Sequence, residues 1–212
     1  MIFKGKKKLD ESPEAEPKEV EAPVHANPDL RIVGLYGELE ENRAASVISV
    51  LLDLAEDSEA EIKENPESEE LTKVNLPIEF LISTPGGSAD DMFAIYDVMR
   101  VVRERCPIST YGLGKVMSAG VLILAAGTKG TRRIGKHCRV MIHSVIAGSA
   151  GSFHNLQNEM SEIKFMQTAY IKALAAETNM TEAKLRRMMN KKVNIYLSAE
   201  EAVELGIADI II

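Results

Sequence analysis

The chain alternates between short runs of apolar, β-branched residues and longer segments whose apolar residues recur at helical spacing. Strands are predicted at 30–37, 76–83, 107–112 and 138–144, and in the closing sequence IADIII at 207–212. Helices are predicted between these runs, over 44–57, over 89–106 and directly after Ser118. Repeated alternation of strands and helices predicts an α/β fold with largely parallel strand pairing.

Capping signals fix where several helices begin. Ser88 and Asp91 have the spacing of a capping box and open the predicted helix 89–106. Ser198 with Glu201 repeats that spacing before the last helix, and a shorter helix is predicted after Thr181.

The segment 152–178 is predicted to form one long amphipathic helix, because its apolar residues recur near helical spacing. These residues are Leu156, Met160, Ile163, Met166, Tyr170 and Leu174. A helix of this length that projects from the body must cover its apolar stripe, and a second subunit is the expected cover. The sequence therefore predicts a homo-oligomer.

Two polar segments fall outside this pattern. Residues 1–28 are rich in Lys, Glu and Pro and are predicted to be a flexible, charged N-terminal arm that precedes one domain over 29–212. Residues 56–75 are mostly acidic and are predicted to form a solvated loop inserted in that domain, with a short helix as the alternative.

Charge and composition narrow the class of protein. A net charge of −7 argues against a nucleic-acid surface, which is usually basic. Cys106 and Cys138 are too few for a disulfide framework, so two buried thiols in a reducing compartment are expected. The N-terminus lacks the apolar core of a signal peptide, and no apolar run approaches the ~18 residues that span a membrane. We therefore expect a cytoplasmic protein without membrane or nucleic-acid partners.

A nucleotide site and a metal site are not expected. Residues 130–137, GTRRIGKH, nearly match a phosphate-binding loop, but His137 stands where that loop needs a hydroxyl for Mg²⁺. A strand is predicted next, where a phosphate loop would open a helix. The histidines, at 25, 137, 143 and 154, lack the spacings typical of metal ligands.

Three features together meet the needs of acyl transfer. Ser118 stands at the start of a predicted helix, where a serine is usually only a cap, and it lacks the G-x-S-x-G elbow of α/β-hydrolases. His143 ends an apolar strand, and Gly86-Gly87 lie in the turn TPGGS, which alone would indicate only a tight turn. A nucleophile, a base and backbone donors for an oxyanion are more specific together than each is alone.

The ordered motifs STPGGSADDMFAIYDVM, GKVMSAGVLILAAGTKGTRR, CRVMIHS and YLSAEEAVELGIAD resemble the proteolytic subunit of the Clp protease (ClpP). The resemblance runs from about residue 30 to the C-terminus. It implies a ClpP/crotonase-like spiral of stacked βαβ units, with 152–178 as a handle helix that joins two stacked heptameric rings. It also implies a self-compartmentalised serine endopeptidase that acts on unfolded polypeptides.

The resemblance assigns roles to the candidate residues. Ser118 is the implied nucleophile, His143 the base, and the backbone N–H groups of Gly86 or Gly87 and of Ala119 the oxyanion hole. No cofactor is implied, and ATP would act only through a partner, a hexameric AAA+ ATPase unfoldase. The unusual segments 1–28 and 56–75 are expected to alter which unfoldase docks, or to prevent docking.

The third catalytic position departs from the family. Where the family has an aspartate, this chain has Asn194, which can orient His143 but cannot offset the imidazolium charge. The alternatives are a slow enzyme, an enzyme that uses Asp209 or Glu200 instead, and an inactive ring subunit that serves as an assembly scaffold.

Two other enzyme classes are disfavoured by the sequence. A relative of signal-peptide peptidases would use a Ser-Lys dyad with Lys115 or Lys129 as base, but the chain lacks a membrane segment and has His143. A crotonase-type acyl-CoA enzyme shares the implied fold but does not need a serine beside its oxyanion hole.

Overall fold

The computed structural model describes residues 30–62, 71–191 and 193–212, and Arg31–Ile212 form one compact unit. The strands are β1 (Ile32–Tyr36), β2 (Glu59–Ile62), β3 (Thr72–Asn75), β4 (Ile78–Thr84), β5 (Ile108–Met117), β6 (Arg133–Ile134), β7 (Arg139–Ile142), β8 (Ile195–Leu197) and β9 (Ile210–Ile211). The helices are α1 (Glu41–Glu56), α2 (Ala89–Val102), α3 (Ala119–Ala125), α4 (Phe153–Glu177), α5 (Glu182–Met189) and α6 (Ala199–Glu204). The alternation predicts β1, β4, β5, β7, β9 and the helices, but not β2, β3, β6 or β8. The fold is α/β, as predicted.

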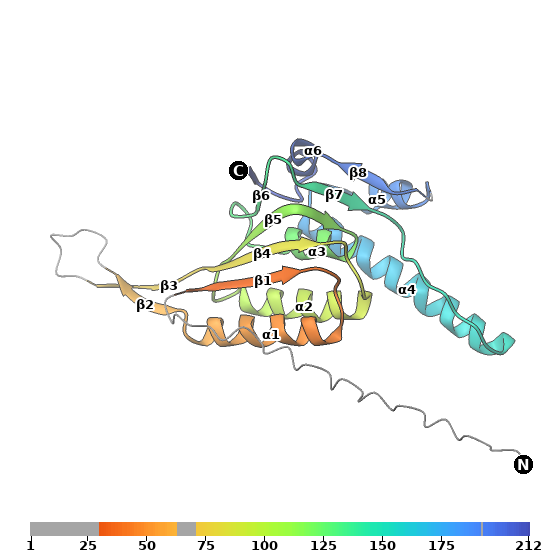
Figure 1. Ribbon diagram of the computed structural model, residues 1–212, viewed down its shortest axis with the longest axis horizontal. Coiled ribbons are helices and arrows are strands. Elements are labelled where there is room, and N and C mark those ends of the chain that lie inside the picture. The colour runs from red at the N-terminus through yellow and green to blue at the C-terminus, as the bar shows by residue number, and fades with distance from the viewer. Residues whose placement is uncertain (1–29, 63–70, 192) are drawn as a thin grey trace, which may run out of the picture. The chain divides into compact units, whose positions relative to one another are not determined.

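The main sheet divides at β5. Strands β1, β4 and β5 pair in parallel, and the first half of β5 continues to β6 and then β9, also in parallel. The second half of β5 pairs in parallel with β7, which pairs antiparallel with β8. The C-terminal ends of β4, β5 and β7 therefore lie next to one another, and the loops that follow them meet at one edge of the sheet (Figure 1).

Helices cover one face of this sheet and build the core. Along β4 the buried positions alternate with half-exposed ones, so that Ile78, Phe80 and Ile82 face the helices. Helix α1 packs against α2, α2 against α3, and α3 against α4. In Figure 1, α1 and α2 lie along the strands while α4 runs away from them. Helix α3 is buried on all sides, which explains its lack of charged residues.

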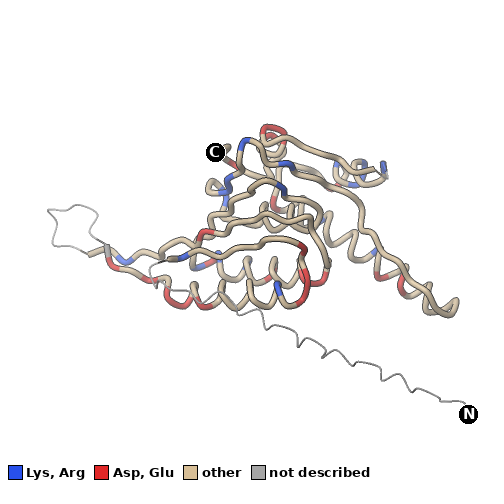
Figure 2. The backbone as a smooth tube through the Cα atoms, viewed as in Figure 1, with Lys and Arg blue, Asp and Glu red and all other residues tan. Residues whose placement is uncertain are grey.

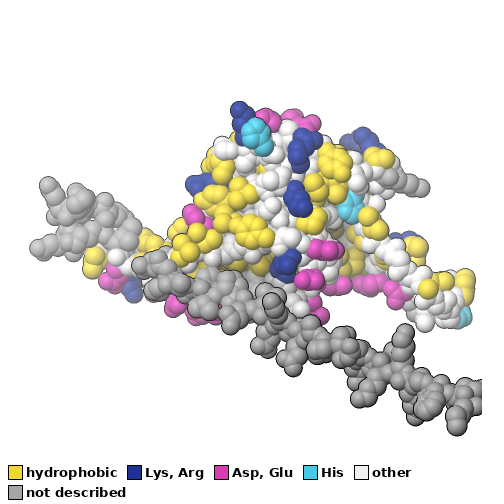
Figure 3. Space-filling view, in the orientation of Figure 1, with side chains coloured by type: hydrophobic (Ala, Val, Ile, Leu, Met, Phe, Trp, Pro, Cys, Tyr) yellow, Lys and Arg dark blue, Asp and Glu magenta, His cyan; other side chains and the backbone are white. Residues whose placement is uncertain are grey.

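The long helix α4 confirms the prediction over 152–178, and Ser152 caps it by accepting a hydrogen bond from the Asn155 N–H. Only its C-terminal half is buried. Apolar side chains of the other half stand exposed, at Phe153, Leu156, Met160 and Phe165, and hydrophobic surface is visible along this helix in Figure 3.

The acidic segment 56–75 differs from the loop that its composition predicts. Its described ends form an antiparallel pair, β2 with β3, while residues 63–70 lie outside the described residues. The sequence EAEI at 59–62 does alternate polar and apolar residues, as a strand requires, but its charge masks that signal. The predicted N-terminal arm, 1–28, also lies outside the described residues.

Charges of both signs are distributed over the described surface (Figure 2). Acidic residues lie along α1 and in the turn before it, whereas basic residues gather near β5 to β7 and on α5.

No helix within 30–62, 71–191 and 193–212 is long and apolar enough to cross a membrane. Over the same residues, no group of three metal-ligating side chains comes together.

Candidate active site

Ser118 occupies a sharp turn between the central strand β5 and helix α3. Its N–H donates to the Met141 carbonyl of β7 at 2.8 Å, which ties the turn to the neighbouring strand. Its backbone has φ 55° and ψ −120°, and among the described non-glycine residues it is the one with a positive φ. Such a conformation costs roughly 1–3 kcal/mol and is found mostly at functional sites.

The side chain of Ser118 does not serve as a helix cap. It stands at the N-cap position of α3 but makes no capping hydrogen bond, and no hydrogen bond of its Oγ is found among the described residues. The ordinary cap interpretation of this serine is therefore wrong.

The Gly86-Gly87 turn lies against Ser118. Gly86 has φ +99°, and a Cβ at this position would lie 2.6 Å from the Ser118 Cβ and 2.9 Å from the Met117 carbonyl oxygen. Gly87 has φ +153°, and a Cβ there would lie 2.0 Å from the Leu39 carbonyl oxygen. Both positions thus require glycine, because another residue would push the turn away from the serine.

The hydrogen bonds of this turn distinguish its two glycines. The Gly86 N–H donates to Thr84 Oγ1 at 3.0 Å, and the neighbouring Ser88 N–H donates to the Leu39 carbonyl. Within the described residues, no acceptor is found for the N–H of Gly87 or of Ala119. Of the two glycines that the sequence left open, Gly87 therefore has the free donor.

His143 follows directly after the last residue of β7. Its Nδ1 lies 2.5 Å from the Ser144 carbonyl oxygen, a contact that requires a proton on Nδ1. In that tautomer Nε2 has a free lone pair and can accept a proton.

One cavity of about 340 Å³, here called the Ser118 cavity, brings most of the predicted site residues together. Its wall includes Gly86, Gly87, Ser118, Ala119 and His143. These residues come from the loops after β4, β5 and β7, at the sheet edge where those strands end.

Comparisons with known proteins show which family this chain is similar to. The Clp protease family matches residues 67–212. Over 182 residues the chain is 33% identical to the ATP-dependent Clp protease proteolytic subunit 4 of Rhodococcus jostii (strain RHA1). The aligned residues cover 86% of this chain and 84% of that protein. It is 32% identical, over 86% of this chain and 80% of the other, to the ATP-dependent Clp protease proteolytic subunit of Deinococcus radiodurans.

This chain belongs to the Clp protease family. Its parallel sheet with covering helices agrees with the ClpP/crotonase fold that the sequence implied. The members named above are proteolytic subunits, which makes the Ser118 cavity the first candidate for chemistry in this Clp protease family member.

Asn194 stands across the strand pair from His143. Strands β7 and β8 pair Ile142 with Ile195, so the next step of this register sets His143 opposite Asn194. Opposite residues of an antiparallel pair point to the same face. Asn194 is nevertheless exposed, and the described residues show no hydrogen bond from it to His143, whose Nδ1 is bound to Ser144 instead.

The two carboxylates considered as substitutes have other partners. Asp209 pairs with Arg132 at 2.5 Å; burial alone would raise its pKa, but hydrogen bonds from Arg132 and Gly130 outweigh this effect and lower it. Glu200 is exposed on α6, and its pKa is lowered by its own backbone N–H and by Ser198, with Lys136 and His137 nearby. Neither carboxylate is bonded to His143.

Sequence reasoning missed the apolar wall of the Ser118 cavity. Met92 and Phe93 of α2 and Met166 and Tyr170 of α4 line it. The sequence places Met166 and Tyr170 on the apolar stripe of the long helix. Helical spacing alone does not reveal that Tyr170 contacts Ser118, which lies 52 residues earlier in the chain.

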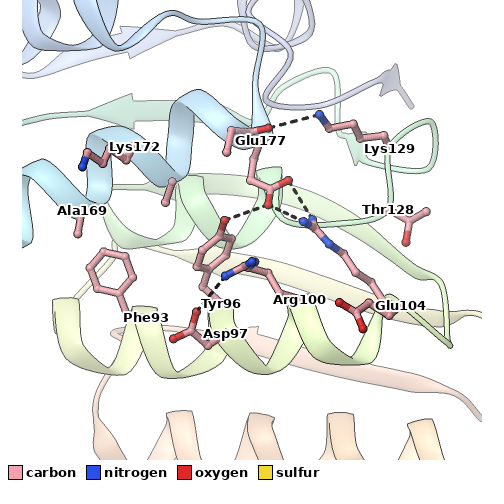
Figure 4. A pocket seen from close by; sticks show the side chains of 13 residues that line it. Phe93, Tyr96, Asp97, Arg100, Glu104, Thr128, Lys129, Ala169, Lys172 and Glu177 are labelled. Carbon is pink, nitrogen blue, oxygen red and sulfur yellow. Dashed lines mark hydrogen bonds and ion pairs between the residues drawn. The ribbon is translucent and has the colours of Figure 1, made fainter.

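A second and larger cavity of about 750 Å³, the Glu177 cavity, lies farther along α2 and α4 (Figure 4). Figure 4 shows Tyr96 and Glu177 pointing toward each other. The buried Glu177 carboxylate accepts from Tyr96 at 3.0 Å and from Arg103 at 2.6 and 2.9 Å. Burial, together with Glu177, raises the pKa of Tyr96 to about 12.

The Glu177 cavity is a structural junction. Its buried carboxylate is neutralised by Arg103 and joins α4 to α2. Lys129, one of the two bases considered for a Ser-Lys dyad, lines this cavity and contacts the Ala176 carbonyl at 3.4 Å. That position is outside the wall of the Ser118 cavity, and Lys115, the other base, is exposed and also outside it.

Proposed function

We propose that this protein is a serine endopeptidase in which Ser118 forms an acyl-enzyme with the carbonyl carbon of a peptide bond. The single observation that carries the proposal is the strained, uncapped Ser118, which shares one cavity with His143 and the free N–H groups of Gly87 and Ala119. A serine held in this way has no packing or capping role, and the observed strain suggests a functional one.

In the proposed reaction, Ser118 Oγ attacks the peptide carbonyl while His143 Nε2 takes its proton. The Oγ–C bond forms, and the carbonyl electron pair moves to the oxygen, which the N–H groups of Gly87 and Ala119 stabilise. His143 then gives its proton to the departing amine as the C–N bond breaks. Water repeats these steps on the acyl-enzyme and releases the acid.

The hydrogen bond from His143 Nδ1 to Ser144 supports this assignment of the base. It holds the tautomer in which Nε2 accepts a proton, a task that a triad carboxylate usually performs. A neutral carbonyl offsets the charge of the imidazolium less than a carboxylate does, so we expect a slower enzyme than one with a complete triad.

A second candidate function is that of a weakly active or silent ring subunit kept for its assembly. The observation that favours it is Asn194, which is exposed and not bonded to His143 among the described residues. The two candidates differ in one measurable respect, the rate at which Ser118 of the unaltered protein reacts.

For assembly, we propose two stacked heptameric rings joined through α4, with a hexameric AAA+ ATPase unfoldase as the partner that delivers polypeptides. The exposed apolar side chains of α4 support a protein contact at this helix, because apolar patches of this kind are usually covered. A mass of 23.3 kDa, that of one chain, in size-exclusion chromatography with light scattering would contradict the proposal.

The test of the activity is hydrolysis of a short fluorogenic peptide by the full-length protein. Ser118→Ala is expected to abolish the hydrolysis, with a loss on the order of 10⁶-fold in kcat where the rate can be followed that far. Ser109→Ala, a control on β5, the strand that leads to Ser118, is expected to keep it. Hydrolysis that survives Ser118→Ala would come from another site or from a contaminant and would contradict the proposal.

A further inference from the structure

We propose that Tyr170 is a positioning residue that orients the Ala119 N–H of the oxyanion hole by holding the carbonyl oxygen of the same peptide unit. The Tyr170 hydroxyl donates to the Ser118 carbonyl oxygen at 2.9 Å, across 52 residues of sequence. This inference rests on the proposed serine peptidase function and adds a residue to it.

The planar peptide bond couples the direction of its carbonyl oxygen to that of its N–H group. The Ser118 carbonyl and the Ala119 N–H belong to one peptide unit, whose trans geometry makes them point in opposite directions. A group that fixes the carbonyl oxygen therefore also fixes the direction of the N–H. Tyr170 lies on one side of this peptide, and its control of the N–H does not require contact with a substrate.

The backbone at this peptide needs such a restraint. Ser118 has φ 55° and ψ −120°, a conformation that a non-glycine residue leaves unless its surroundings hold it. The carbonyl oxygen has two partners, the Tyr170 hydroxyl and the Val121 N–H of α3. The Val121 bond belongs to the first turn of a short helix, whereas Tyr170 comes from a separate element and resists rotation of the whole turn.

Tyr170 itself is firmly placed. The residue is 5% exposed and stands in the buried part of α4, beside Ile171 and Leu174. Burial raises the pKa of its hydroxyl, which therefore stays protonated and can donate at neutral pH. One turn earlier, Gln167 of α4 accepts a hydrogen bond from the Val145 N–H at 2.7 Å, close to His143. Helix α4 thus contacts the backbone beside both reacting residues.

Tyr170→Phe removes only the hydroxyl and keeps the buried ring, and Tyr96→Phe is the matched control. Tyr96 is also a buried tyrosine that donates to an oxygen, but its partner is Glu177 in the other cavity. Both variants lose one buried hydrogen bond, so a fall in melting temperature is expected in both. Only the positioning role predicts that Tyr170→Phe, and not Tyr96→Phe, also impairs catalysis.

The kinetic test uses the full-length, assembled protein, a fluorogenic peptide and a peptide boronic acid, whose tetrahedral adduct places an oxygen in the oxyanion hole. Loss of a whole oxyanion donor costs about 10²–10³ in kcat, so a misdirected one is expected to cost about tenfold. For Tyr170→Phe we expect kcat to fall about tenfold with KM nearly unchanged, and boronate affinity to fall by a similar factor. Tyr96→Phe is expected to retain both values within about twofold. Equal effects in the two variants, or an unchanged kcat in Tyr170→Phe, would overturn the proposal.

A crystal structure of Tyr170→Phe gives a result that does not depend on activity. The Ser118–Ala119 peptide is expected to turn away from a ψ of −120° or to occupy two orientations, while Tyr96→Phe retains one. An unchanged, singly occupied peptide in Tyr170→Phe would overturn the positioning role. Hydrolysis that survives Ser118→Ala would instead overturn the peptidase function, so the two failures are distinguishable.

Discussion

The two cavities beside α2 and α4 use their polar groups in opposite ways. In the Glu177 cavity the buried carboxylate is paired with Tyr96 of α2 and with Arg103 at the end of α2, so these bonds tie α4 to α2. In the Ser118 cavity the serine hydroxyl and the N–H groups of Gly87 and Ala119 have no partner among the described residues. Phe93 lines both cavities.

This difference shows why cavity size is a poor guide to function here. In the larger cavity, of about 750 Å³, the buried carboxylate of Glu177 is neutralised by Arg103 and bonded to Tyr96, which leaves it occupied in structural contacts. The smaller one, of about 340 Å³, contains the strained Ser118, His143 and N–H groups without partners among the described residues, which are the groups that we propose for acyl transfer. Variants in the Glu177 cavity should change stability, and variants in the Ser118 cavity should change activity.

Among variants that leave Ser118 and His143 in place, the largest effect is expected from Gly86→Ala. The new Cβ would lie 2.6 Å from the Ser118 Cβ, so the serine must move. We expect the rate of peptide hydrolysis to fall by about 10²-fold or more, because misplacement of a reacting group by about 1 Å can cost this much. Gly130→Ala is the control: Gly130 also has a positive φ, of +89°, but a Cβ there meets nothing within 4 Å. Both variants should lose about 1–2 kcal/mol of stability to backbone strain. Peptide hydrolysis measures the loss of activity, and chemical denaturation measures the loss of stability. Equal rates of hydrolysis in Gly86→Ala and Gly130→Ala would contradict this prediction.

Glu177→Gln tests the other cavity. The substitution leaves the charge of Arg103 unpaired beside a nearly buried position. We expect the free energy of unfolding to fall by about 2–3 kcal/mol. This is less than for a fully buried pair, because Arg103 is 25% exposed. Glu56→Gln, which breaks an exposed pair with Arg105, is expected to cost less than about 0.5 kcal/mol. Urea denaturation measures both. Catalytic constants that fall in Glu177→Gln while stability is retained would reverse the roles of the two cavities.

Asn194→Asp is expected to increase kcat by about tenfold or more, because a carboxylate opposite His143 stabilises the imidazolium that forms when Ser118 attacks. The control is Asn190→Asp, the same chemical change at an exposed residue after α5, which should leave kcat unchanged. A rate that is zero in the unaltered protein and appears only in Asn194→Asp would favour the silent ring subunit. An unchanged rate in Asn194→Asp would show that position 194 does not act on His143.

The titration of Tyr96 has the smallest effect at neutral pH, because it changes stability only in the alkaline range. The pKa of Tyr96 is raised to about 12 in the folded protein and is near 10 in the unfolded chain, so the unfolded chain loses the proton first as pH rises. The contribution of protonated Tyr96 to the free energy of unfolding is complete below pH ~10. It is lost between pH ~10 and pH ~12, with a limiting slope of about 1.4 kcal/mol per pH unit. Tyr96→Phe should flatten this part of a stability–pH curve measured by denaturation. An identical slope in the variant would contradict the assigned pKa.

The sequence predicts the alternating elements well where the hydrophobic period is uninterrupted, as in α4 and β4. It fails where glycine or charge masks that period. The strand predicted at 107–112 continues to Met117 as β5, through Gly112 and Gly114, and that extension is what brings the chain to Ser118. The strand β8 has only three residues, too few to show a pattern.

The candidate site shows the same division. Ser118, His143 and the glycine turn stand out because their residue types meet the needs of one reaction. Which glycine has a free N–H depends on the side chain of Thr84, and the role of Tyr170 depends on a contact across 52 residues. Such contacts are set by tertiary packing and leave no periodic signal in the chain.

The most direct test of the central claim is covalent labelling of the full-length protein with a fluorophosphonate, followed by intact mass measurement and peptide mapping. The account predicts one adduct per chain, on Ser118, and strongly slowed labelling in His143→Ala. Because labelling needs only an activated serine and an oxyanion hole, it detects even a slow enzyme. Absence of an adduct on Ser118, in the unaltered protein and in Asn194→Asp alike, would contradict the claim that this cavity is an active site.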